Sequence, residues 1–320
     1  MMKDALPAIF SLIERFSRWA AVAVILLFAL LRIAGIDLNM SVQITIALIA
    51  LLIGIPHGAI DHLISIPSKP RGRFLLYIVM YVAIALLAGW AIATWNLNGF
   101  RVVVVMSALH FGYGDAAFRN EWKTASAVKK SPWFVESIYA LPAGFAPVVL
   151  PLTDSRTRSA LHRINPALIN WTGSHGHLLR TTTLAVAIAA IFILMVLRAL
   201  PFALDLVVLL CLAVVTPPLI AFAIYFGFWH ATRHTARLVS KLENSRVLAA
   251  NGSVFRALRG AITPGLYAII GTFVISAGLM HFENAHFSFG LLWSALVVIW
   301  ALAVPHMLST SRFDIRAIRR

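Results

Sequence analysis

Apolar runs of about 20 residues, the length needed to cross a bilayer, recur from Arg18 to the C-terminus with only short polar segments between them. The 320 residues are 60% hydrophobic and only 12% charged, which excludes a water-soluble globule. In lipid, a backbone satisfies its hydrogen bonds only as helices or as a closed barrel, and the sequence lacks alternating barrel strands. It therefore predicts an all-α, polytopic transmembrane helical bundle that forms a single integral-membrane domain, residues 1–320.

We expect about ten membrane-spanning helices from the number of these runs. The expected spans are residues 18–36, 41–66, 74–95, 99–118, 132–151, 181–200, 202–216, 217–238, 262–281 and 287–308. The stretch 201–218 is the least regular, because Pro201, Pro217 and Pro218 allow either two short helices or one broken helix. The first run is too long and starts too late for a cleaved signal peptide, so we expect it to remain as a helix.

Lys and Arg cluster near the N-terminus, after the second, fourth and eighth runs, and at the C-terminus. Because basic residues in short loops stay on the cytoplasmic side, this pattern predicts a multi-pass protein of the cell inner membrane with both termini in the cytoplasm. The segment 152–180 is an exception, since it is placed outside and yet carries several arginines. We interpret the net charge of +15 as an orientation signal and expect no nucleic-acid partner.

Ionisable side chains inside apolar runs cost about 2.5–3.5 kcal/mol each on insertion, so each is a candidate functional group. Here they concentrate in the segments GIPHGAIDH, SALHFGYGD, YFGFWHATRH and VPHM. These segments contain His57, Asp61, His62, His110, Asp115, His230, His234 and His306. All four spans run in one direction under the predicted topology, so their histidines are expected at similar depths, with His306 somewhat deeper.

The spacing of His230 and His234 is i, i+4, which places both imidazoles on one helical face where they can hold one ion. Such a pair alone is weak evidence, because two interfacial histidines near a helix end have the same spacing. Two further histidines at matching depth, His57 and His110, strengthen the hypothesis of a metal centre. The single cysteine, Cys211, leaves imidazole and carboxylate as ligands, and neutral histidines suit Fe, Cu, Ni or Zn.

Two carboxylates follow the first two histidines at short spacing. Asp61 and Asp115 are expected to accept the distal N–H of a metal-bound imidazole and fix its tautomer; pairing with arginine at a helix end is the alternative. His62 and His306 are expected to support the ligands or the structure.

Aromatic side chains surround the histidine positions in the sequence. The candidates for an apolar substrate tunnel are Phe111, Tyr113, Tyr225, Phe226, Phe228 and Trp229. Apolar aromatic walls fit an apolar ligand, and packing between helices or against lipid is the other interpretation.

The histidine motifs of this sequence resemble those of the Brp/Blh-type membrane carotenoid oxygenases, which make retinal for microbial rhodopsins. GIPHGAID resembles the first histidine motif of that family, LHFGYGD the second, TPPLIAFAIYFGFWHATRH the third, and VPHM the end of its last helix. The order and spacing agree from about residue 41 to 310. Ala231 stands where a serine is expected, and the first 40 residues look like an extra helix relative to shorter members.

The resemblance implies oxidative cleavage of β-carotene at its central 15,15' double bond with O₂, giving two molecules of all-trans-retinal. It implies Fe(II) as the cofactor, with iron ligands at His57, His110, His230 and His234. β-Carotene is expected to enter from the lipid bilayer, and the retinal is expected to pass to a microbial rhodopsin.

Three other functions use histidines within a membrane. A lipid desaturase or hydroxylase usually needs an HxxHH pattern, which is absent from the sequence. A b-haem electron carrier would use paired histidines as axial ligands, and a transporter would use them to relay protons or bind a transported metal. Each makes a different spectroscopic or enzymatic prediction.

Overall fold

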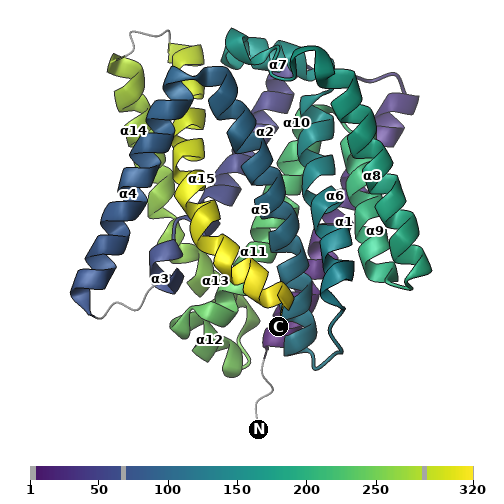
Figure 1. The fold of residues 1–320 in the computed structure, drawn as a ribbon, viewed down its shortest axis with the longest axis vertical. Helices are drawn as coiled ribbons and strands as arrows, with labels where there is room; N and C mark the ends of the chain where they lie inside the picture. Colours follow the sequence, from purple (N-terminus) through teal and green to yellow (C-terminus); the bar gives the residue numbers. More distant parts are fainter. Residues whose placement is uncertain (1–4, 66–69, 283–286, 320) are drawn as a thin grey trace.

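The computed structural model describes residues 5–65, 70–282 and 287–319, and this part of the chain is helical with no strand (Figure 1). The long helices are α1 (Leu6–Ile33), α2 (Met40–Gly58), α4 (Arg71–Thr94), α5 (Asn96–Ala125), α6 (Trp133–Leu152), α8 (Gly176–Val196), α9 (Leu200–Val215), α14 (Tyr267–Phe282) and α15 (Phe287–Arg319). The shorter helices are α3 (Asp61–Ser65), α7 (Thr157–Ile164), α10 (Pro218–Ala223), α11 (Ala231–Lys241), α12 (Glu243–Ala250) and α13 (Val254–Ile262), with single turns η1 (Pro166–Leu168), η2 (Gly173–His175) and η4 (Thr263–Gly265) and a π-helical segment η3 (Ile224–His230).

The long helices stand side by side, and the start of α1 and the end of α15 lie at the same end of the bundle (Figure 1). Helices α12 and α13 lie at that end, whereas α7 lies across the opposite end. The segment 152–180, which was expected outside, therefore lies at the end of the bundle away from the termini, as the alternation of spans requires.

Seven described helical segments are long and apolar enough to cross a membrane. They are Leu6–Ile33, Met40–Gly58, Arg71–Thr94, Trp133–Leu152, Gly173–Val196, Val254–Leu279 and Leu292–Ile318. The expected count of about ten is not confirmed, because the other three runs fall on different kinds of helix. Helix α9 has 16 residues, α5 carries several charged residues, and the run 217–238 is divided among α10, η3 and α11.

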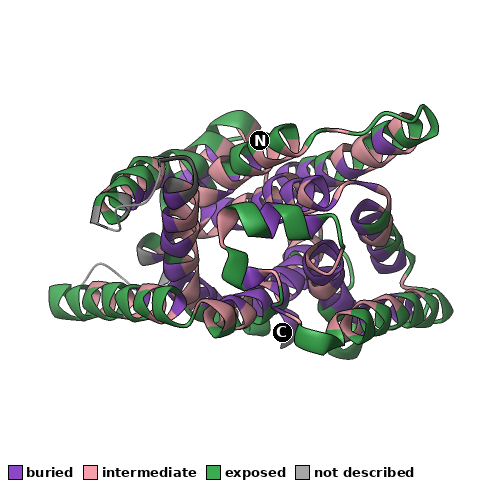
Figure 2. Ribbon diagram, turned by 90° about the horizontal axis from the view of Figure 1, so that it is seen from above, coloured by how far each residue is buried: buried purple, intermediate pink, exposed green. Residues whose placement is uncertain are grey.

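The outward faces of the bundle are apolar. Figure 2 shows buried residues in the interior and exposed ones around the outside. Large exposed side chains include Leu30, Ile33, Leu86 and Tyr267, each at least 65% accessible. In water such a surface would drive aggregation, so this arrangement fits a bundle whose solvent is lipid.

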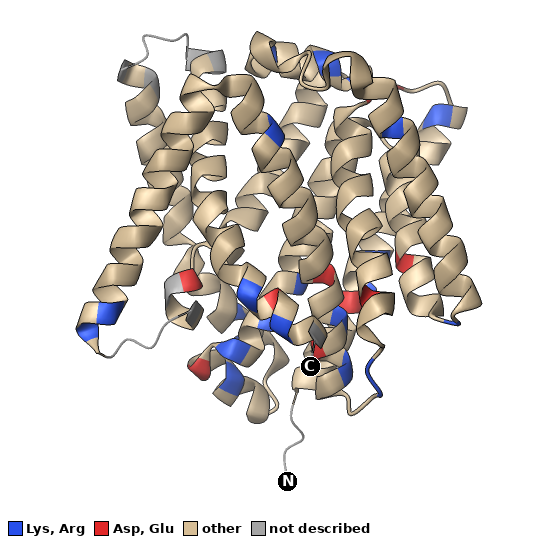
Figure 3. Ribbon diagram, viewed as in Figure 1, with Lys and Arg blue, Asp and Glu red and all other residues tan. Residues whose placement is uncertain are grey.

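Charged side chains gather toward the end that carries the termini (Figure 3). At the centre of this layer Asp205 of α9 is fully buried and accepts hydrogen bonds from Arg18 of α1 (2.6 Å to Oδ1), Arg119 of α5, and Arg233 of α11 (3.2 Å to Oδ2). Sequence analysis did not single out Asp205, although it is a lone carboxylate in an apolar run. This arginine–aspartate cluster ties four helices together, because each buried charge needs a partner.

Helices α5 and α6 approach closely at two glycines. A Cβ atom on Gly112 would overlap the carbonyl oxygen of Ala140, and one on Gly144 would overlap the carbonyl oxygen of Ala108. Small residues at such a crossing let two backbones approach in lipid. The contact fixes the part of α5 that carries His110.

Replacing Gly112 with alanine should force α5 and α6 apart, because the obstructing atom belongs to a backbone carbonyl that cannot rotate away. We expect a loss of about 1–3 kcal/mol of stability, typical of overpacking. The measurement is thermal unfolding of the detergent-solubilised protein by circular dichroism. Gly271→Ala in α14 is the matched control, since its Cβ would meet open space and should leave the melting temperature unchanged or raised.

Replacing Asp205 with asparagine should remove the buried negative charge that Arg18, Arg119 and Arg233 share. Breaking a buried ion pair typically costs about 3–5 kcal/mol, so this variant should melt well below the wild type. Glu243→Gln, which removes an exposed partner of Arg246, should change stability by less than about 1 kcal/mol. Equal melting temperatures for these two variants would show that Asp205 does not hold the helices together.

Candidate metal centre

Five buried histidines from four parts of the chain meet inside the bundle. We call them the histidine cluster: His57 at the end of α2, His110 in α5, His230 at the end of η3, His234 in α11 and His306 in α15. The ring centroids of His57 and His234 are 5.0 Å apart, those of His110 and His230 are 5.0 Å apart, and those of His110 and His306 are 4.9 Å apart. The four predicted ligand positions therefore lie together, and His306 lies with them.

Irregularities in the helices bring these side chains together. Pro305 lies inside α15, and Figure 1 shows that the helix changes direction partway along its length. Proline removes a backbone N–H and clashes with the preceding turn, which bends a helix. His306 follows that proline directly, and Gly58 at the end of α2 lies against its ring.

A π-helical segment precedes the paired histidines. Residues Ile224–His230 form η3, and α11 continues from Ala231. A π segment adds a residue to the turn and re-aims the side chains that follow it, and such segments are frequent at functional sites. The rings of His230 and His234 lie 6.1 Å apart on the same side.

Three histidines have their Nδ1 atoms held by a neighbour. The Nδ1–H of His57 donates to the carbonyl oxygen of Gly54, and that of His110 to Thr310 Oγ1 at 3.3 Å. The Nδ1–H of His306 donates to both carboxylate oxygens of Asp61, at 2.9 and 3.0 Å. With the proton on Nδ1, each ring keeps Nε2 free as an acceptor.

Several ring nitrogens of the cluster are buried without a partner. Nε2 of His110, His230 and His306 and Nδ1 of His234 are buried and have no hydrogen-bond partner among the described residues. Ligand atoms of His57, His110 and His306 lie within 4.8 Å of one another. Buried polar atoms without partners need an explanation, and several converging lone pairs fit a bound cation. Nitrogen donors without thiolate suit Fe, Cu, Ni or Zn.

The two predicted supporting carboxylates have different surroundings. Asp61 contacts His306, and its Oδ2 also accepts from Tyr81 (3.1 Å). Asp115 accepts from the indole N–H of Trp229 and from Tyr139 (3.3 Å), and it lies 3.5 Å from Arg233. Asp115 therefore adjoins the arginine–aspartate cluster. This position resembles the alternative role given for it above, in which it pairs with an arginine instead of a histidine. The side chain of His62 lies outside the described part of the structure.

The predicted aromatic walls divide into two groups. Phe111 packs on His230 with ring centroids 4.4 Å apart, Phe226 packs on His57, and Tyr113 lines a neighbouring cavity. The other three serve the packing of the helices: Tyr225 donates to Ala143, Trp229 donates to Asp115, and the ring of Phe228 meets Phe16.

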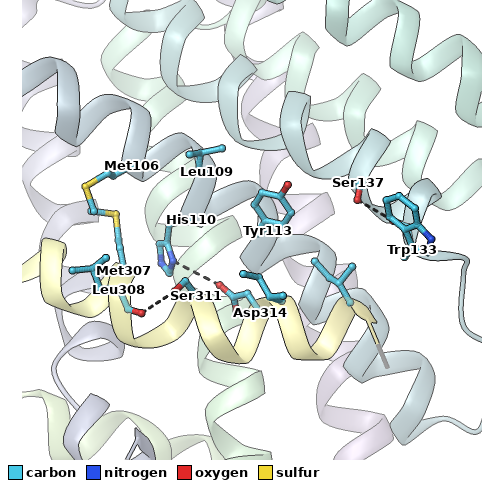
Figure 4. Close-up of a pocket in the computed structure, with 12 residues that line it drawn as sticks. Met106, Leu109, His110, Tyr113, Trp133, Ser137, Met307, Leu308, Ser311 and Asp314 are labelled. Atoms are coloured by element: carbon cyan, nitrogen blue, oxygen red, sulfur yellow. Dashed lines mark hydrogen bonds and ion pairs between the residues drawn. The ribbon is translucent and has the colours of Figure 1, made fainter. Parts of the chain in front are cut away.

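Two cavities adjoin the histidine cluster, and both are lined by His110 and Met307. The smaller, of about 260 Å³, lies among α2, α5, α14 and α15 and is also lined by His57 and His306. The larger, of about 810 Å³, lies among α5, α6 and α15 (Figure 4). Figure 4 shows Met106 and Met307 beside His110, with Trp133 at the other end of the cavity.

Sequence analysis missed two residues that position the histidines. Thr310 lies one turn after His306, and its hydroxyl donates to the His306 carbonyl oxygen (2.9 Å) while accepting from His110. Tyr81 of α4 holds Asp61. The i+4 spacing from His306 could have indicated Thr310, whereas no local pattern connects Tyr81 to a residue on another helix.

Comparison with known proteins gives a consistent family. A family model for beta-carotene 15,15'-dioxygenase matches residues 48–314. A beta-carotene 15,15'-dioxygenase of uncultured marine bacterium 66A03 is 26% identical over 279 residues, which cover 81% of this chain and 90% of the relative. The probable beta-carotene 15,15'-dioxygenase Blh of Halobacterium salinarum is 25% identical and covers 92% of this chain and 90% of the relative. No solved structure matches. By the family match over most of its length, the chain belongs to the beta-carotene 15,15'-dioxygenase family.

Proposed function

We propose that this protein is a membrane-embedded, iron-dependent dioxygenase that cleaves β-carotene at its central 15,15' double bond with O₂ and releases two molecules of all-trans-retinal. The observation that carries the proposal is the histidine cluster, whose ring nitrogens are buried without partners and which adjoins two largely apolar cavities. Family membership supports the same reaction.

In this proposal His57, His110, His230 and His234 hold Fe(II), and their neutral imidazoles suit that ion. When bound, the iron supplies the site where O₂ is bound and activated. The protein orients the imidazoles through Gly54 and Thr310, and it excludes water because every ring is buried. The chain's remaining task is to present the correct double bond.

The cavities lie one after the other along α15. The smaller is lined by residues of α15 from Ile299 to Met307, and the larger by residues from Met307 to Ile318. At about 1.5 Å per residue, these stretches measure about 12 and 16 Å. A long polyene that passes His110 would thus place one half in each cavity, with its middle beside the cluster. Positioning of this kind can supply much of the catalysis when the substrate has no polar group to bind.

A substrate that dissolves in lipid can enter from the side. Leu109, Leu308 and Ile315 line the larger cavity and are each about 40–50% exposed on the outer face. We propose that α5, α9 and the α10–α11 segment also cross, which gives ten spans in an inner membrane with both termini in the cytoplasm. The retinal is proposed to pass to a microbial rhodopsin.

Expression in carotene-accumulating bacteria should bleach the orange colour and produce retinal, measured by chromatography. His230→Ala and His234→Ala should each lower retinal by more than the 10–100-fold typical of residues that merely support a metal ligand. His162→Ala, an exposed residue of α7, is the control and should be near neutral. Full retinal production by His234→Ala would contradict the ligand assignment. If folded, iron-loaded protein left the carotene unchanged, β-carotene would not be its substrate. An intense Soret band in the absorption spectrum of the protein would indicate haem in place of non-haem iron.

Filling the smaller cavity should affect cleavage more than filling the larger one. Ala303→Phe adds a ring to the cavity of about 260 Å³, and Ser311→Phe adds a ring to the one of about 810 Å³ on the same helix. We expect Ala303→Phe to lower retinal formation at least about ten-fold, equivalent to about 1.4 kcal/mol, and to shift any remaining cleavage toward two unequal aldehydes. Ser311→Phe should retain most activity. Retinal yields from both variants that equal the wild-type yield, at equal metal content, would exclude the two-cavity channel.

A further inference from the structure

We propose that His306 is a fifth nitrogen ligand of the metal centre and that Asp61 is the residue that positions it. This inference rests on the proposed iron site and extends it, because the four expected ligands lie on α2, α5, η3 and α11, whereas His306 lies on α15. Its test measures metal binding, so it does not depend on carotene cleavage.

Distances place His306 in the tightest part of the cluster. Its ligand atom lies within 4.8 Å of those of His57 and His110, and its ring centroid is 5.5 Å from that of His234. One ion about 2.1 Å from each nitrogen would separate two ligand nitrogens by up to about 4.2 Å. The three imidazoles therefore need only small movements to share an ion.

The hydrogen bonds of His306 are those of a metal ligand. Its Nδ1–H donates to both oxygens of Asp61, and its buried Nε2 has no partner in the described part of the chain. A histidine that served only the core would be expected to satisfy both nitrogens. Metal-bound histidines commonly donate the other ring N–H to a carboxylate, which fixes the tautomer and raises the basicity of the ligand.

Asp61 is itself held in place from two other helices. Its Oδ2 accepts from Tyr81 of α4 at 3.1 Å and from Ser309 of α15 at 3.4 Å, and it is only 2% exposed. The carboxylate therefore cannot turn away to water, and the ring of His306 has one orientation. Tyr81 and Ser309 thus hold Asp61, and Asp61 in turn holds Nδ1 of His306. The other ring nitrogen of His306, Nε2, stays free.

Helix α15 also links His306 to His110. The Thr310 hydroxyl donates to the backbone carbonyl of His306 and accepts from Nδ1 of His110. One helix thus contributes a ligand and positions a second ligand on α5. His306 would then add a fifth nitrogen to those of the four histidines proposed to hold the ion, and nitrogen donors suit Fe(II).

The test is anaerobic titration of metal-free, detergent-solubilised protein with Co(II), followed by visible ligand-field absorption and elemental analysis. We expect the wild type to bind one ion per chain. His306→Ala should bind at least ten-fold more weakly and change the Co(II) spectrum, and added imidazole should restore the spectrum by filling the vacated space. Asp61→Asn should weaken binding 10–100-fold, the range typical of residues that orient a ligand. His162→Ala should behave as the wild type.

The proposal is overturned if folded His306→Ala binds Co(II) with wild-type affinity and spectrum. Should that variant unfold, Asp61→Asn decides, since an unchanged affinity and spectrum would equally overturn it. A wild type that binds no metal would refute the metal centre as a whole. A wild type that binds metal with His306 but makes no retinal from β-carotene would refute the proposed function and leave this inference standing.

Discussion

The convergence of unprotonated imidazole nitrogens in a low-dielectric interior is the constraint on which the site depends. Each lone pair that loses water without gaining a donor costs free energy, and here ligand atoms of His57, His110 and His306 lie within 4.8 Å of one another. A cation bound among them would turn this cost into binding energy. The same constraint gives a reason for two irregularities, Pro305 inside α15 and the π-helical segment η3. Each changes the direction of a helix or of its side chains next to a histidine of the cluster.

A second buried network lies beside the cluster and has a different role. Asp205 accepts hydrogen bonds from three arginines and Asp115 lies 3.5 Å from Arg233, so both carboxylates have positive charge beside them within the protein. The histidine cluster, by contrast, keeps several buried ring nitrogens without a partner among the described residues. The ion pairs of Asp205 join α1, α5, α9 and α11, and two of these helices carry His110 and His234. Charge pairing thus provides the rigid frame that a preorganised metal site requires.

Periodicity and membrane physics sufficed to predict the helical bundle and the positions where histidines gather, since both depend on local sequence. The sequence does not reveal the contacts that distant parts of the chain make. His306 was expected somewhat deeper than the other histidines, whereas its ring centroid lies 4.9 Å from that of His110, because a uniform rise along a straight helix ignores the bend at Pro305. Asp61 was expected to accept the N–H of an imidazole, but local spacing does not indicate that this imidazole is His306, which is 245 residues away. The count of about ten spans is not confirmed, because α9 has only 16 residues and α5 carries several charged residues, among them Arg119, whose partner Asp205 lies on another helix.

Helix α15 explains how one structure can join selectivity to chemistry. Its residues from Ile299 to Ile318 follow both cavities, and between them stand His306 and Met307, one turned to the cluster and the other shared by both cavities. Under the proposed function, the distance from His306 to the end of each cavity would be set by helical rise within this one element. A motion of α15 would then shift His306 and both cavities together, so a polyene lying in them would keep its position relative to the histidine cluster. For an apolar polyene, which offers no group to anchor by hydrogen bonding, this shared support is the physical basis on which one bond among many can be chosen.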